Sequence, residues 1–133
     1  MRLLLDTHVI LWLLGEPERI APGVRRVIED TRHAVLISAA SAWEIATKHA
    51  LGKLPLPESP EVLLERAVRE LCAVELSITR RHGLLSASLP NHHRDPFDRL
   101  LVAQAMLEDA TLVTADHLLP PYGATLLLWA SPR

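Results

Sequence analysis

The sequence predicts an α/β protein built on a parallel sheet. Short apolar runs alternate with longer amphipathic segments along the 133 residues, and this alternation is typical of βαβ units. A chain of this length normally forms one domain, and its 49% hydrophobic content can fill one core. We therefore expect a single domain over residues 1–133. Five runs have the length and composition of buried strands: residues 2–5, 34–37, 73–76, 111–114 and 124–128.

Helix signals occupy the segments between these runs. Residues 7–14, apolar from Val9 onward, are predicted as a helix that stops near Gly15 and Pro17. Pro22 suits the first position of a second helix that runs to about residue 30. Ser38 can cap a third helix, which Gly52 ends. Three more helices are expected at residues 60–70, 79–87 and 95–108. Two proline-containing segments are predicted as connections, residues 54–57 and 90–94.

Composition narrows the class of protein. Fourteen basic and sixteen acidic residues give a net charge of −2, which gives no overall support for nucleic-acid binding but is compatible with a local basic patch. The single cysteine, Cys72, excludes an internal disulfide and is expected to be a small core residue. No apolar run approaches the roughly 20 residues of a membrane span, and Asp6 and His8 interrupt the leucine-rich start. We expect a cytoplasmic protein.

Four carboxylates share one structural context. Asp6 directly follows the first expected strand, and Asp116 comes two residues after the fourth. Glu44 and Asp98 lie in the early turns of two expected helices. In an open parallel sheet, ligands bind in the crevice at the carboxyl ends of the strands, so the four side chains could converge there. Converged carboxylates repel one another unless cations neutralise them, and Mg²⁺ and Mn²⁺ prefer oxygen ligands.

Each of these acids, taken alone, also has a structural explanation. Asp6 could cap the helix that follows it, and Asp116 could be an ordinary turn residue. Glu44 could form a solvated pair with Lys48 one helical turn away. Asp98 could favour the dipole of its helix, although Asp95 can already serve as the cap. Their common placement at strand ends is what a shared metal site explains.

Four segments form a recognisable set: LLLDT at residues 3–7, SAASAWEIA at 38–46, DPFDRLLVAQA at 95–105 and LVTAD at 112–116. Together they closely resemble the PIN domain and, more narrowly, the VapC toxins of type II toxin–antitoxin systems. The resemblance implies a three-layer fold with a central parallel five-stranded sheet. It also implies a Mg²⁺- or Mn²⁺-dependent endoribonuclease whose catalytic, metal-binding acids are Asp6, Glu44, Asp98 and Asp116. Thr7 and Thr114 match polar positions that can support this site.

The same resemblance implies the reaction and the partners. The cation would activate a water molecule that hydrolyses an RNA phosphodiester, leaving 5′-phosphate and 3′-hydroxyl ends. A cognate VapB-type antitoxin would lie in an apolar groove, and homodimers are usual. Possible interface residues are Trp12, Leu13, Leu14, Leu54 and Leu56. Basic side chains must flank an acidic centre that binds RNA, and the candidates are Arg99, Lys48, Arg80 and Arg81, with Lys53, His82, His92, His93 and Arg94 also considered.

The residues alone leave other functions possible. The fold could be a non-catalytic binding module whose acids hold the basic residues of a partner. A structure-specific DNA nuclease would need a helical arch, for which 133 residues leave no room. An aspartyl phosphatase would use an Asp-x-Asp motif, and His8 occupies its second position. His92 and His93 lie in a polar segment without the usual metal-ligand spacing, so we expect them to be solvated.

Overall fold

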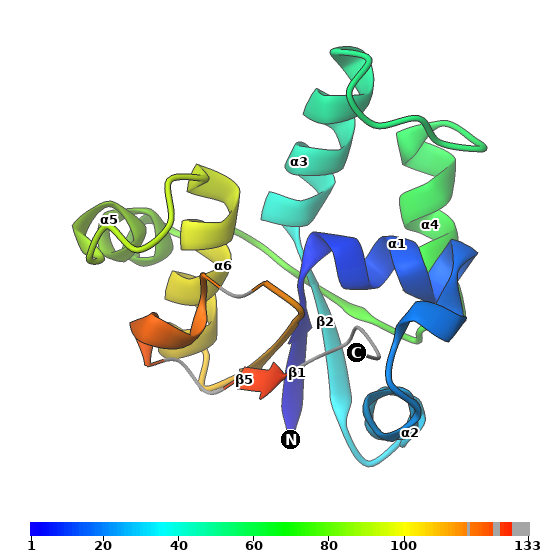
Figure 1. Cartoon of the computed structure of the whole chain (residues 1–133), viewed down its shortest axis with the longest axis horizontal. Coiled ribbons are helices and arrows are strands. Elements are labelled where there is room, and N and C mark those ends of the chain that lie inside the picture. Colours follow the sequence, from blue (N-terminus) through cyan, green and yellow to red (C-terminus); the bar gives the residue numbers. More distant parts are fainter. Residues whose placement is uncertain (117, 124–125, 129–133) are drawn as a thin grey trace.

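The computed structural model contains a five-stranded, fully parallel sheet in the order β3-β2-β1-β4-β5 (Figure 1). The structure describes residues 1–116, 118–123 and 126–128. The strands are β1 (Arg2–Leu5), β2 (Ala34–Ser38), β3 (Val74–Leu76), β4 (Thr111–Thr114) and β5 (Leu126–Leu128). The predicted α/β class with a parallel sheet is confirmed. Residues 124 and 125 of the expected fifth strand lie outside the described residues.

Helices flank this sheet in the order that the sequence predicts. They are α1 (Thr7–Gly15), α2 (Pro22–Glu29), α3 (Ala39–Ala50), α4 (Pro60–Glu70), α5 (Arg80–Ser88) and α6 (Pro96–Leu107), with short 3₁₀ turns η1 (Pro17–Arg19) and η2 (Pro120–Tyr122). Figure 1 shows α1, α2 and α4 on one side of the strands and α5 and α6 on the other. Four of the helices begin at side-chain caps where the sequence places Ser or Thr or Asp before them: Ser38, Ser59, Thr79 and Asp95.

The central strand β1 explains why the chain begins with a leucine run. Leu3 and Leu5 belong to the core on the α1, α2 and α4 side, whereas Leu4 belongs to the core on the α6 side. All three leucines are fully buried. Side chains alternate between the faces of a strand, so a central strand covered by helices on both faces must be apolar at every position. The residue that follows this strand, Asp6, therefore enters a buried environment.

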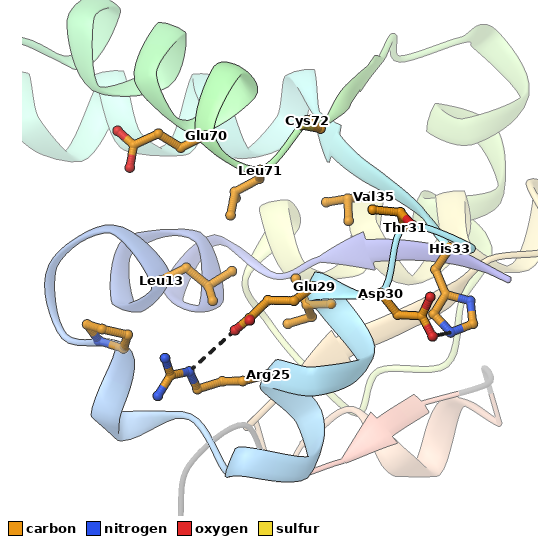
Figure 2. Close-up of a pocket in the computed structure, with 12 residues that line it drawn as sticks. Leu13, Arg25, Glu29, Asp30, Thr31, His33, Val35, Glu70, Leu71 and Cys72 are labelled. Atoms are coloured by element: carbon orange, nitrogen blue, oxygen red, sulfur yellow. Dashed lines mark ion pairs between the residues drawn. The ribbon is translucent and has the colours of Figure 1, made fainter.

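The predictions for Cys72 and His82, two residues that do not line the predicted site, are wrong. Cys72 is exposed rather than buried, because it occupies the left-handed turn (φ 49°) between α4 and β3. It lines a hollow of about 460 Å³ together with residues such as Leu13, whose side chain Figure 2 shows on the opposite wall. His82 is no surface cation, because its side chain is 1% exposed, completes the capping box of α5 and lies 2.9 Å from the Glu108 carboxylate.

Candidate active site

The structure brings the four predicted acids together. Asp6, Glu44, Asp98 and Asp116 line one cleft of about 470 Å³, which we call the acidic cleft; its other lining residues are His8, Trp12, Arg19, Lys48, Asp95 and Ala115. Asp6 and Asp116 follow the carboxyl ends of the neighbouring strands β1 and β4, and Glu44 and Asp98 come from α3 and α6. The cleft therefore lies at the edge of the sheet where open α/β folds bind their ligands.

Asp6 does not cap its helix with its side chain. Its backbone occupies the N-cap position of α1, but the carboxylate makes no capping hydrogen bond. Instead, Oδ2 accepts a hydrogen bond from the Thr114 hydroxyl at 2.6 Å, while Oδ1 is buried without a partner among the described residues. Asp6 is 4% exposed, and this burial raises the pKa of its carboxyl group. One oxygen of Asp6 is thus left for a ligand.

Thr114 joins Asp6 to Asp116. Its hydroxyl donates to Asp6 and accepts the backbone N–H of Asp116 at 3.0 Å. Asp116 Oδ1 in turn accepts the backbone N–H of Leu118 at 2.9 Å, so this aspartate does form a local turn. Its other oxygen, Oδ2, points to His93. The turn therefore orients the carboxylate but occupies only one of its two oxygens. The two threonines predicted to support the site, Thr7 and Thr114, are both buried in contact with its acids.

Glu44 is 2% exposed and is held from two sides. Oε1 accepts a hydrogen bond from the Thr7 hydroxyl at 2.6 Å, and Oε2 forms an ion pair with Lys48. The predicted Glu44–Lys48 helix pair therefore exists, but on its glutamate side it is buried rather than solvated. Lys48 Nζ also lies 3.7 Å from Asp95 Oδ2, so its charge is balanced by acids of the cleft.

His93 lies between two of the acids, so the prediction that its side chain would be solvated is wrong. Nε2 lies 2.8 Å from Asp116 Oδ2 and 3.3 Å from Asp98 Oδ2, and the side chain is 12% exposed. Nδ1 accepts the backbone N–H of Asp95 at 3.0 Å. Because a neutral imidazole carries one proton, this contact places the proton on Nε2, where it is donated to the acids. Its neighbour His92 is exposed and rests edge-on against the Tyr122 ring, 5.0 Å between centroids.

Arg99 holds the segment that carries His93. Its Nη1 donates to the carbonyls of Pro90 and His93 at 3.0 and 3.3 Å, and Nη2 donates to the carbonyls of Ser86 and Leu89, both at 2.9 Å. The guanidinium is thus engaged with the backbone of residues 86–93. The RNA-binding role predicted for Arg99 does not fit this placement.

Arg80 and Arg81 are exposed at the start of α5, and neither lines the acidic cleft. Of the four RNA-binding candidates, only Lys48 is a lining residue. The cleft instead contains two basic side chains that the sequence did not indicate, His8 and Arg19. No local signal marked Arg19, because it lies in the short turn between two helices.

Asp98 shows the electrostatic strain of the cluster most clearly. Its side chain comes from the first turn of α6, where Asp95 serves as the cap by accepting the Phe97 N–H at 2.8 Å. Asp98 is 8% exposed. Burial, and after it the neighbouring carboxylates of Asp6, Asp95 and Glu44, raise its pKa to about 8. Burial raises the pKa of both Asp6 and Asp98, and buried carboxylates whose charged form is disfavoured in this way are suited to a hard divalent ion.

The comparisons with known proteins place this chain in a family. A model of the PIN domain matches residues 3–120. Ribonuclease VapC22 of Mycobacterium tuberculosis is 28% identical over 116 residues, which cover 86% of each chain. Ribonuclease VapC16 of the same organism is 41% identical over 58 residues, which cover 44% of this chain and only 41% of that protein. The chain therefore belongs to the PIN-domain family, and the resemblance to VapC proteins is confirmed.

A solved structure agrees on the fold. The complex of Rickettsia felis VapBC2 with a promoter DNA fragment contains a chain that matches with a TM-score of 0.72 at 16% identity, covering 97% of this chain and 99% of that one. At 16% identity the match is evidence for the fold alone. Among the described residues, we find no helix with the length and apolar character needed to cross a membrane.

Proposed function

We propose that this protein is a metal-dependent endoribonuclease toxin of the VapBC type, formed by one PIN domain over residues 1–133. The observation that carries the proposal is the acidic cleft itself. Four carboxylates from four elements converge there, and Asp6 Oδ1 is buried without a partner among the described residues. The relatives named ribonuclease and the VapBC complex support the same reading.

The residues of the cleft fit a Mg²⁺ or Mn²⁺ ion. All four acids offer oxygen atoms, which these hard cations prefer, and the unpartnered Asp6 oxygen gains a ligand when one binds. We assign Asp6, Glu44, Asp98 and Asp116 as the residues that hold it. Bound there, such an ion would supply Lewis acidity, lowering the pKa of a water molecule and stabilising the developing charge on a phosphodiester.

The chain's own side chains set the geometry around these acids. Thr114 fixes Asp6 relative to Asp116, Thr7 fixes Glu44, and His93 donates its Nε2 proton between Asp98 and Asp116. Hydrogen bonds to the second oxygen of a metal-binding carboxylate orient it and tune its affinity. We therefore assign Thr7, Thr114 and His93 as positioning residues of the site.

A groove beside the acidic cleft suits the predicted antitoxin. It has a volume of about 270 Å³ and is lined by α1 and by the connection before α4, including Trp12, Leu14, Leu54 and Leu56. These are four of the five residues that the sequence suggested as interface residues. We propose that an apolar segment of a VapB-type antitoxin binds here, and that the toxin forms homodimers or larger assemblies with it.

The experiment measures RNA cleavage by purified, antitoxin-free protein in EDTA, Mg²⁺ and Mn²⁺. We expect cleavage only with metal, with 5′-phosphate and 3′-hydroxyl product ends. Asp6→Asn should be the most damaging replacement in the quartet, because Asp6 lies nearest the centre of the sheet. Asp109→Asn is the matched control, since Asp109 is exposed in a left-handed turn (φ 51°) that asparagine tolerates.

The non-catalytic alternative makes the opposite prediction. A binding module whose acids hold a partner's basic residues would cut no RNA with either metal, and Asp6→Asn would weaken the partner complex instead. Absence of metal-dependent cleavage by the wild-type protein would therefore overturn the enzyme proposal. Equal cleavage by Asp6→Asn and by the Asp109→Asn control would overturn the assignment of the site.

A further inference from the structure

We propose that Arg19, stacked on Trp12, binds a phosphate of single-stranded RNA at the side of the acidic cleft. The inference rests on the proposed ribonuclease function and names a substrate-binding site within it. Both residues line the same cleft as the four acids. The guanidinium carbon of Arg19 lies 4.4 Å from the centroid of the Trp12 ring.

An acidic site that binds RNA needs a basic side chain whose charge is not neutralised by the acids of the site. The acids that line the cleft repel an RNA backbone in the absence of metal, and phosphate contacts by Lys or Arg supply most of the affinity for nucleic acid. The basic side chains that line the cleft, among the described residues, are His8, Arg19 and Lys48. Lys48 is already paired with Glu44 and lies close to Asp95.

Arg19 has no comparable partner among the described residues of the cleft. Its ion pair is with Glu16, which does not line the cleft, at 3.8 Å. The side chains of this pair are 49% and 58% exposed, so the pair is screened by solvent and binds weakly. The Arg19 guanidinium is therefore available to a phosphate.

The stacking on Trp12 prepares this guanidinium for binding. An arginine held over an aromatic ring by a cation–π contact loses less freedom when it forms two parallel hydrogen bonds to phosphate oxygens. The support is itself fixed, because Trp12 packs against the core and Ile20, directly after Arg19, is 1% exposed. Tryptophan and arginine planes also stack unpaired bases, which a duplex does not offer, and so the site favours single-stranded RNA.

The experiment measures binding of a fluorescein-labelled single-stranded oligoribonucleotide in Mn²⁺, using the Asp6→Asn background to prevent cleavage. Arg19→Ala should weaken binding about fivefold to tenfold and make the slope of log K against log salt shallower by about 0.7. Arg19→Lys should keep the slope but lose affinity about threefold, because lysine cannot form the stacked, two-pronged contact. The control is Arg26→Ala, which removes an arginine of α2 that is also exposed but does not line the cleft.

Two further measurements separate this role from others. Mn²⁺ affinity of the Arg19→Ala variant in the wild-type background should be unchanged, because Arg19 contacts none of the proposed metal ligands among the described interactions. If Arg19→Ala and Arg26→Ala bind RNA with equal affinity and equal salt slope, the inference is wrong. It is also wrong if Arg19→Ala weakens only the complex with an antitoxin. Wild-type protein that cuts no RNA would instead refute the underlying enzyme proposal.

Discussion

Replacing Asp98 with asparagine should stabilise the metal-free protein at neutral pH. Asp98 is 8% exposed, and its Oδ2 lies 3.3 Å from His93 Nε2. Burial, followed by the nearby carboxylates, raises its pKa from the ordinary 3.8 to about 8. Asparagine is nearly isosteric and can accept the same hydrogen bond, but it carries no charge that must be suppressed.

The sign and size of this effect follow from the two pKa values. Below pH 3.8 the carboxyl group is protonated in both states, so the folded protein has its full stability. Between pH 3.8 and about 8 the unfolded chain releases the proton and the folded chain retains it, so stability falls as the pH rises. At pH 7 a full shift would amount to about 4 kcal/mol, and proton sharing among the neighbouring acids reduces this to on the order of 2 kcal/mol.

Urea unfolding in EDTA between pH 4 and pH 8 measures this difference. Asp98→Asn should match the wild type near pH 4 and exceed its free energy of unfolding increasingly towards pH 8, whereas the Asp109→Asn control should follow the wild type throughout. Saturating Mg²⁺ should stabilise the wild type and leave Asp98→Asn almost unchanged, because the variant lacks a ligand. A variant less stable than the wild type at pH 7 in EDTA would refute the electrostatic reasoning.

Three other variants test the surroundings of the site. In Asp30→Asn the sign of the effect reverses, because hydrogen bonds from Arg32 hold the pKa of Asp30 well below its usual range. A urea series extended down to pH 2 should show that the variant is less stable than the wild type above pH 4, and that this loss shrinks as the pH falls below 3.8. His93→Ala should weaken Mn²⁺ binding by about tenfold in calorimetry while the neighbouring His92→Ala does not, and equal affinities would exclude a positioning role for His93. Arg99→Ala should lower the unfolding free energy by about 2–3 kcal/mol and also weaken Mn²⁺ binding, because it releases the segment that carries His93; a stable variant with normal Mn²⁺ affinity would contradict this.

The strands and the acids were predictable because their signals are local. A central strand with helices on both faces must be apolar at each position, and the run from Leu3 to Leu5 meets that requirement. The carboxylates that follow such runs are then placed by topology, since parallel strands end at one edge of the sheet. The sequence therefore predicted which acids meet without predicting any distance between them.

The contacts of His93 and Arg19 were not predictable, because tertiary packing decides them. His93 stands in a polar, proline-bounded segment whose composition is typical of a solvated loop. The position of His93 depends on Arg99, which lies six residues later in the sequence. It also depends on Tyr122, which lies 29 residues later and whose hydroxyl accepts the His93 N–H at 2.7 Å. Arg19 reaches the cleft only because the turn after α1 folds back onto Trp12.

Asp6 shows most directly how the fold favours the site over local stability. An aspartate at an N-cap position normally accepts a hydrogen bond from its helix, and losing that bond costs about 1 kcal/mol. Asp6 occupies this position in α1 but turns its carboxylate to Thr114 instead. Helix α1 tolerates the loss because Val9 and Ile10 are fully buried against the sheet. Packing against the sheet therefore stabilises α1 in place of the missing cap. One buried oxygen of Asp6 remains available to bind a cation.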